Sequence, residues 1–148
     1  MSLIVLEGVD GSGKTTLANI LSRVLNAEVI HATRETPNDW GWFSEIMDRA
    51  KTKSIIMDRA FWGQFAYQGP MERHLTWESL HELEHRLEQE GGKLIYVTAD
   101  PPDIERRLAG RNEALSLPLY QLISSYSILK SFADCTVITY NTSTGEVS

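Results

Sequence analysis

The sequence has little cysteine and no long apolar run. Its single cysteine, Cys135, excludes an internal disulfide, and because it lies in an alternating apolar stretch it is expected to be buried and unreactive. No apolar run approaches the roughly 20 residues that span a bilayer, and no segment resembles a signal peptide. These absences predict a cytoplasmic protein that does not enter a membrane.

Positive charge is also scarce, because 14 Lys and Arg stand against 20 Asp and Glu, a net charge of −6. Tight non-specific binding of nucleic acid needs a basic surface that displaces counterions, so this balance argues against it. A local basic site stays open, because Arg106, Arg107 and Arg111 cluster late in the chain. The 148 residues, 42% of them apolar, are enough for one domain with its own core.

Apolar runs alternate with helical patterns along the chain. The patterns predict strands at residues 2–7, 28–31, 54–57, 93–98 and 135–140, and helices at 14–26, 39–50, 59–68, 76–90, 101–108 and 118–133. Strands that alternate with helices form a mostly parallel sheet covered on both faces. We therefore predict a three-layer α/β fold in which residues 1–148 form a single domain around a five-stranded sheet.

A phosphate-binding loop follows the first predicted strand. Residues 8–15, Gly-Val-Asp-Gly-Ser-Gly-Lys-Thr, fit the P-loop pattern Gly-x-x-x-x-Gly-Lys-Ser/Thr at every fixed position. Glycines let backbone N–H groups surround a phosphate, Lys14 would contact the β- and γ-phosphates, and the Thr15 hydroxyl would bind Mg²⁺. The residues predicted to bind ATP are Gly8, Asp10, Gly11, Ser12, Gly13, Lys14, Thr15 and Thr16.

The P-loop alone does not separate kinases from switches and motors. A GTPase would carry an Asn-Lys-x-Asp motif, which is absent, and a motor ATPase would normally need a larger domain. Ligands of such sheets bind at the carboxyl ends of the strands. The polar residues at those ends are Asp10, Arg34, Glu35, Asp58, Arg59 and Asp100.

Segments at these strand ends resemble thymidylate kinases. Residues 7–16 look like the opening of that family, and residues 33–37, Thr-Arg-Glu-Thr-Pro, resemble its Thr-Arg-Glu-Pro-Gly segment. Residues 58–69 match its Asp-Arg-aromatic segment, with the trailing Ala-Tyr-Gln-Gly in register, and the turn at 98–103 also fits. The resemblance implies a P-loop kinase fold and the transfer of a phosphoryl group from ATP, with Mg²⁺, to a thymidine-like pyrimidine deoxynucleotide.

The resemblance also implies roles on the acceptor side. Asp10 would hydrogen-bond the 3′-hydroxyl of the acceptor sugar, and Arg34 and Arg59 would hold the acceptor phosphate. Asp58 would organise the magnesium ion. The alternatives are a surface salt bridge for Asp58 and Arg59 and a solvated loop for Arg34 and its neighbour Glu35.

Further roles concern the base and the lid. Tyr67 and Gln68 would border a pyrimidine base. Arg107 and Arg111, four residues apart on one helical face, resemble lid arginines that neutralise charge on the migrating phosphoryl group. The alternative for this pair is a solvated helix end.

Two segments are shorter than in thymidylate kinases. The stretch after Glu35 lacks the longer helical insertion that covers the base, and the lid runs from Arg111 almost directly into the last helix. The acceptor-binding side should therefore be more open than in a kinase of free nucleotides. Trp40, Trp42 and Phe43 lie in the shortened stretch and either stack on a base or pack in the core.

Glu35 leaves the chemistry of the acceptor open. A phosphate acceptor needs no general base, whereas a hydroxyl acceptor benefits from a carboxylate within hydrogen-bond reach, and nucleoside kinases keep such a base at this place. The leading hypothesis is a thymidylate or deoxynucleotide kinase. The second is a kinase of bacteriophage type that phosphorylates a 5-hydroxymethyl pyrimidine, such as 5-hydroxymethyluracil, within DNA, and the third is a non-catalytic nucleotide-binding module. The partners are ATP and a pyrimidine nucleotide, and the sequence leaves a homodimer open.

Residues 81–85, His-Glu-Leu-Glu-His, also satisfy the zinc-protease signature H-E-x-x-H. Both histidines lie beside the apolar stripe of a predicted helix, and no histidine follows His85 that would complete a zinc site. We therefore interpret this segment as a solvated, charged helix face.

Overall fold

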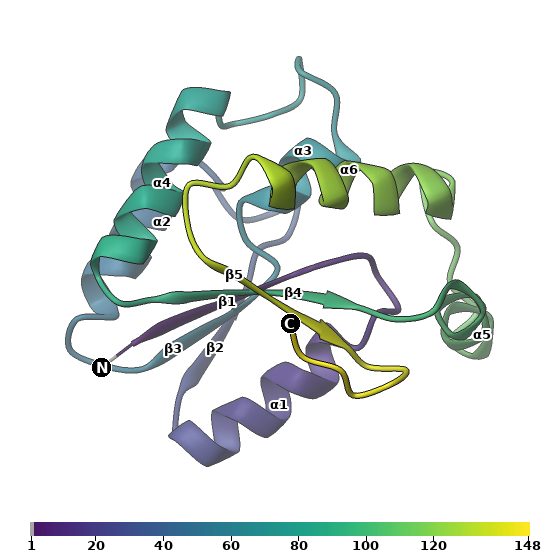
Figure 1. The fold of residues 1–148 in the computed structure, drawn as a ribbon. Helices are drawn as coiled ribbons and strands as arrows, with labels where there is room; N and C mark the ends of the chain where they lie inside the picture. The colour runs from purple at the N-terminus through teal and green to yellow at the C-terminus, as the bar shows by residue number, and fades with distance from the viewer. Residues whose placement is uncertain (1) are drawn as a thin grey trace.

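The computed structural model describes residues 2–148 and contains one five-stranded sheet (Figure 1). The strands are β1 (Leu3–Glu7), β2 (Glu28–His31), β3 (Ile55–Asp58), β4 (Lys93–Thr98) and β5 (Val137–Asn141). The helices are α1 (Lys14–Leu25), α2 (Trp40–Arg49), α3 (Trp62–Tyr67), α4 (Trp77–Gln89), α5 (Pro101–Gly110) and α6 (Leu119–Ser131). The strand order is β2-β3-β1-β4-β5 and all four pairings are parallel, which confirms the predicted α/β fold.

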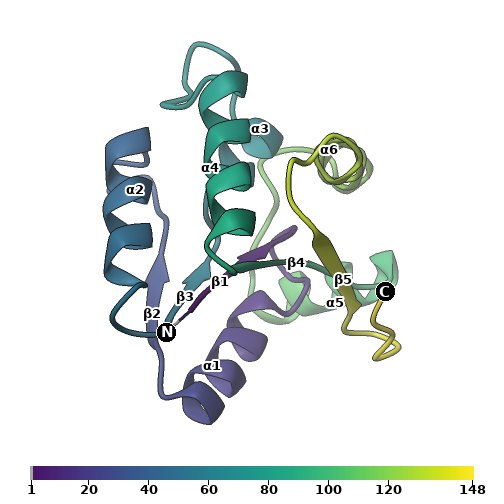
Figure 2. The same ribbon diagram turned by 60° about the vertical axis from the view of Figure 1, so that its left-hand side comes forward.

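Helices cover both faces of the sheet, so the molecule has three layers (Figures 1 and 2). α1 lies on one face, and α2, α3, α4 and α6 lie on the other. Side chains alternate between the faces along each strand. Val5, Met57 and Leu94 therefore join the large core under the four helices, while Leu6 and Ile56 join a smaller core under α1. None of the helices in residues 2–148 has the length and apolar character to cross a bilayer.

The apolar stripe of α1 is less buried than its helical spacing predicts. Leu17 and Leu21 pack partly against the smaller core, but Ile20 and Val24 are 52% and 75% exposed. α1 packs mainly against β1, β2 and β3. Only the side of the helix that faces these strands is therefore buried.

Two elements begin two or three residues later than predicted, each because a side chain occupies backbone N–H groups. The helix expected at 59–68 begins at Trp62, since Arg59 has a left-handed φ of 73° and the Glu7 carboxylate accepts the N–H groups of Ala60 and Trp62. The last strand begins after Thr136, whose N–H donates to the Glu88 carboxylate at 3.1 Å.

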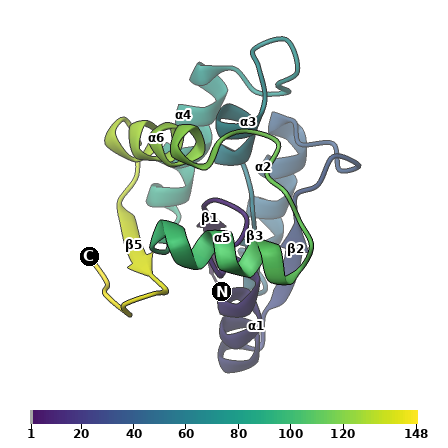
Figure 3. The ribbon, with the colours of Figure 1, turned by 90° about the vertical axis from the view of Figure 1, so that its right-hand side faces the viewer.

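The carboxyl ends of the strands meet at one edge of the sheet, and α5 crosses this edge (Figure 3). The P-loop connects β1 to α1 here, and α5 lies against it, because a Cβ on Gly11 would come within 3.1 Å of Leu108 and 3.2 Å of Ile104. The fold therefore brings the P-loop, the end of β3 and α5 together.

Candidate active site

The P-loop has backbone angles that favour glycine. Gly8, Gly11 and Gly13 have φ values of 152°, 88° and 103°. A Cβ on Gly8 would overlap the carbonyl oxygen of Val97 in β4, so the loop can pass this strand only without a side chain. The loop then turns into α1, whose N-terminus adds a dipole that favours an anion.

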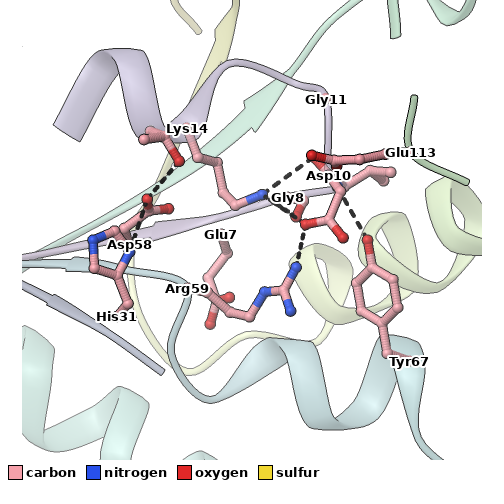
Figure 4. Close-up of polar contacts among 12 residues, drawn as sticks. Glu7, Gly8, Asp10, Gly11, Lys14, His31, Asp58, Arg59, Tyr67 and Glu113 are labelled. Carbon is pink, nitrogen blue, oxygen red and sulfur yellow. Dashed lines mark hydrogen bonds and ion pairs between the residues drawn. The ribbon is translucent and has the colours of Figure 1, made fainter. Parts of the chain in front are cut away.

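The Lys14 ammonium group folds back over the P-loop (Figure 4). It donates to the carbonyl oxygens of Gly8 and Val9 at 2.8 and 3.2 Å and lies 4.0 Å from the Asp10 carboxylate. Burial and the nearby charge of Arg59 lower the pKa of Lys14 to about 8. A phosphate in the loop would counter both effects, because it supplies negative charge beside a buried cation.

Asp58 and His31 meet at the ends of β3 and β2 (Figure 4). Thr15, at the start of α1, contacts the same Asp58 carboxylate. The Thr15 hydroxyl donates to Asp58 Oδ2 at 2.7 Å, and His31 Nδ1 lies 3.2 Å from the same oxygen. Hydroxyl and carboxylate oxygens are ligands that Mg²⁺ accepts, so Thr15 and Asp58 fit the predicted ion. Within residues 2–148, no group of three or more His, Cys, Asp or Glu side chains could hold a metal.

Asp10, Arg59 and Tyr67 form a second cluster on the opposite side of Lys14 (Figure 4). The Arg59 guanidinium pairs with Asp10 Oδ1 and lies 5.0 Å from the centroid of the Tyr67 ring. The Tyr67 hydroxyl accepts the backbone N–H of Asp10 at 3.0 Å. Burial raises the pKa of Tyr67 to about 12, so the hydroxyl stays protonated at neutral pH.

Two cavities adjoin the P-loop. The first, of about 330 Å³, is lined by Asp10, Gly11, Gly13, Lys14, Thr15, Thr16, His31, Ala32, Thr33, Asp58, Arg59, Arg111 and Glu113. The second, of about 630 Å³, is lined by Gly11, Gly13, Thr16, Leu17, Ile20, Arg107, Gly110, Arg111, Tyr140 and Thr142. Gly11, Gly13, Thr16 and Arg111 line both cavities, so the P-loop and the C-terminal end of α5 lie between them.

Some predicted residues lie outside the first cavity. Arg34 and Glu35 are exposed on the turn after β2 and do not line it. Arg107 donates to the carbonyl oxygen of Gly11 at 3.1 Å and to the Thr142 hydroxyl at 2.9 Å, and thereby links α5 to the loop. The buried side-chain oxygen of Gln68 has no hydrogen-bond partner among the described residues. The roles proposed for these residues stay predictions.

The site includes Glu7, His31, Glu113 and Thr142, which were not predicted. Thr142 follows β5 directly, so inspection of the last strand end would have found it. Glu113 Oε1 lies 3.6 Å from Arg111 Nε, in the short segment between α5 and α6. His31 ends β2, where its pairing with Asp58 becomes visible only once the strand register is known.

Glu7 is a fully buried carboxyl group beside this site. It accepts the N–H groups of Ala60 and Trp62 at 3.3 and 2.6 Å. Burial raises the pKa of Glu7 to about 7, although these two hydrogen bonds act in the opposite direction. Glu7 therefore holds the loop that carries Arg59.

The aromatic residues of the shortened segment divide between core and surface. Phe43 is buried and Trp42 packs edge-on against it, with ring centroids 5.0 Å apart. Trp40 is 46% exposed at the start of α2. Of the three, only Trp40 is free to stack on a base.

The H-E-x-x-H segment lies on α4, away from the P-loop. His81 Nδ1 lies 2.9 Å from the buried carboxylate of Glu84, which also accepts the Trp62 indole N–H at 2.7 Å. These contacts tie α4 to α3. The segment is therefore only in part the solvated helix face that was predicted, because Glu84 is buried and His81 is 33% exposed.

No protein-family model matches the chain. In a comparison with curated proteins, a probable thymidylate kinase 1 of Saccharolobus solfataricus is 31% identical over 51% of this chain and 54% of its own length. The chain thus spans about half the length of this relative. The crystal structure of the Bacillus subtilis YorR protein in complex with phosphorylated GDP has 26% identity and a TM-score of 0.80, and the match covers 97% of this chain and 86% of YorR.

The chain has a thymidylate kinase-like P-loop kinase fold. Deoxyadenosine kinase of M. mycoides, solved with dATP, shares this fold with a TM-score of 0.57 and 16% identity, over 93% of this chain and 90% of its own. In this P-loop kinase fold the two polar clusters flank Lys14 at the carboxyl edge of the sheet.

Proposed function

We propose that the chain is a kinase that transfers the γ-phosphoryl group of ATP, with Mg²⁺, to a thymidine-like pyrimidine deoxynucleotide. The observation that carries this proposal is one cavity of about 330 Å³ that contains both Lys14 with the Thr15–Asp58 pair and the Asp10–Arg59 pair. The first group suits a donor triphosphate with its metal ion. The second suits an acceptor that carries a sugar hydroxyl and a phosphate.

On the donor side, the N–H groups of the P-loop and Lys14 would bind the β- and γ-phosphates. Lys14 would exchange its bonds to the Gly8 and Val9 carbonyl oxygens for bonds to phosphate oxygens. Thr15 and Asp58 would hold the magnesium ion, which neutralises phosphate charge when it is bound. The cavity of about 630 Å³ beside α1 and α5 has room for the donor nucleoside.

On the acceptor side, Arg59 would move from Asp10 to the acceptor phosphate, and Asp10 would accept the 3′-hydroxyl of the sugar. The ion pair keeps both side chains at the site until the acceptor replaces their mutual contact. The side-chain oxygen of Gln68, which has no hydrogen-bond partner within residues 2–148, would accept an N–H of the base.

In the reaction, an oxygen of the acceptor phosphate would attack the γ-phosphorus. A bond forms between these atoms, the bond from the γ-phosphorus to the β–γ bridging oxygen breaks, and ADP leaves. The attacking oxygen is already an anion, so no general base is required. Arg59 and Arg111, both at the cavity, would stabilise the negative charge on the transferring group.

A second candidate is phosphorylation of a 5-hydroxymethyl pyrimidine within DNA. The exposed side chains of Glu35 and Trp40, on the segment that follows the cavity residue Thr33, favour it, because a carboxylate and an aromatic ring suit a hydroxyl acceptor on a larger substrate. Glu35→Gln should then reduce transfer to a hydroxyl far more than transfer to a phosphate. Undiminished transfer to a proven hydroxyl acceptor would exclude Glu35 as the base.

An acceptor screen with labelled ATP tests both candidates. Label in dTMP supports the leading proposal, and label retained in hydroxymethyl-pyrimidine DNA but not in plain DNA supports the second. Tight ATP binding without transfer to any acceptor would favour a non-catalytic nucleotide-binding module. Lys14→Ala should abolish transfer, whereas the control Lys53→Ala, an exposed lysine that pairs with Glu28, should retain it.

A further inference from the structure

His31 places an imidazole nitrogen beside the oxygen atoms of Thr15 and Asp58. It ends β2 in register with Asp58, which ends β3, so both side chains lie on the same face at adjacent strand ends. His31 Nδ1 and the Thr15 hydroxyl oxygen lie 3.2 and 2.7 Å from the same Asp58 oxygen. The imidazole is 53% exposed and lines the cavity of about 330 Å³ (Figure 4).

The exposure of His31 argues against a role in packing. The imidazole is half-exposed and therefore buries little apolar area, although its partner Asp58 is buried. The 3.2 Å between His31 Nδ1 and Asp58 Oδ2, in contrast, suits joint ligation, because adjacent ligands on one ion with bonds near 2.1 Å lie about 3.0 to 3.4 Å apart. A neutral imidazole can present the Nδ1 lone pair to an ion with its proton on the exposed Nε2.

We propose that His31 is a nitrogen ligand of the metal ion held by Thr15 and Asp58, and that it makes this site prefer Mn²⁺ to Mg²⁺. This inference rests on the metal site of the proposed function. Magnesium prefers oxygen ligands and binds imidazole weakly, whereas an imidazole ligand raises the affinity of a site for first-row transition ions. Manganese keeps the octahedral geometry and the phosphate ligands that the kinase chemistry requires.

The test is pulsed EPR of Mn²⁺ bound to the protein with a non-hydrolysable ATP analogue. Wild type should show hyperfine coupling to a directly bound ¹⁴N nucleus, and His31→Gln should lose it. The glutamine keeps a polar group near Asp58 but removes the nitrogen lone pair. His85→Gln, which changes an exposed histidine on α4, is the matched control and should keep the coupling.

Affinity measurements in the same complex separate ligation from mere positioning of Asp58. His31→Gln should weaken Mn²⁺ binding by at least about 10-fold and leave Mg²⁺ binding nearly unchanged. Equal losses for both ions, or wild-type protein without nitrogen coupling, would overturn the proposal. Nitrogen coupling in a protein that transfers no phosphate would refute the proposed function and leave this inference standing.

Discussion

The buried carboxyl group of Glu7 connects the core to the candidate active site. Its two hydrogen bonds, from the N–H groups of Ala60 and Trp62, hold the backbone directly after Arg59. Arg59 itself has a left-handed φ, and its guanidinium pairs with Asp10. Its side chain is fully buried, and burial raises its pKa to about 7. The protonation of Glu7 is therefore coupled to folding.

Glu7→Gln should remove a pH dependence of stability. The pKa rises from 4.5 to about 7 on folding, so between these pH values the folded state binds more protons than the unfolded state. The contribution is fully present below about pH 4.5 and is lost as the pH rises through about 7, a difference of roughly 3 kcal/mol. Urea unfolding across this range should show a falling free energy of unfolding in wild type and a flatter profile in the variant. Glu82→Gln, on the exposed face of α4, should behave as wild type, and an unchanged slope in Glu7→Gln would contradict this role.

Arg59→Lys should weaken the acceptor site while the positive charge is kept. A lysine cannot reproduce the planar fork that pairs with Asp10 and stacks over Tyr67. We expect kcat/KM for the acceptor to fall roughly 10- to 100-fold, with ATP affinity within about 3-fold of wild type. Steady-state kinetics and a binding titration measure the two effects. Arg49→Lys, a surface substitution, is the control, and an equal loss of ATP affinity in Arg59→Lys would contradict an acceptor-side role.

At the scale of elements, the connection from β1 to α1 sets the position of the site. Gly8 passes the Val97 carbonyl oxygen of β4 so closely that no side chain fits, and α5 packs on Gly11 from the other direction. The P-loop is therefore held between β4 and α5 before any ligand binds.

Gly8→Ala should destabilise the protein by several kcal/mol. The added Cβ meets backbone rather than a flexible side chain, and φ at this residue is 152°. Gly110→Ala is the control, because a Cβ there has no atom within 4 Å and alanine favours a helix. Denaturant unfolding should show a large loss for the first variant and little change or a gain for the second. Equal stabilities would show that the close approach to β4 is not rigid.

Most of the helices, the strands and the residues at the strand ends were predictable from the sequence, and the exceptions have physical causes. The apolar runs and the P-loop pattern predicted every strand and helix, and the strand-end rule predicted Asp10, Asp58 and Arg59. The start of α3 was not predictable, because it depends on a hydrogen bond from Trp62 to a carboxylate 55 positions earlier in the chain. The contact of His31 with Asp58 was missed because it requires the register of two strands, which local periodicity does not give.

At the scale of the whole molecule, an acidic protein with net charge −6 gathers cations at one edge of its sheet. Lys14, Arg59 and Arg111 line one cavity, and Arg107 lines its neighbour. Acidic groups at the same edge, Asp10 and Asp58, pair with these cations or with Thr15 and His31. The edge is thus suited to two phosphate groups and one divalent ion, which is the requirement of phosphoryl transfer between nucleotides.

Phosphorus NMR of the protein with ATP, Mg²⁺ and dTMP tests this account most directly. We predict that the γ-phosphate signal of ATP falls while ADP and dTDP appear in equal amounts, and that Lys14→Ala leaves the spectrum unchanged. Conversion of ATP to ADP and free phosphate with dTMP intact, or equal transfer by Lys14→Ala, would contradict it.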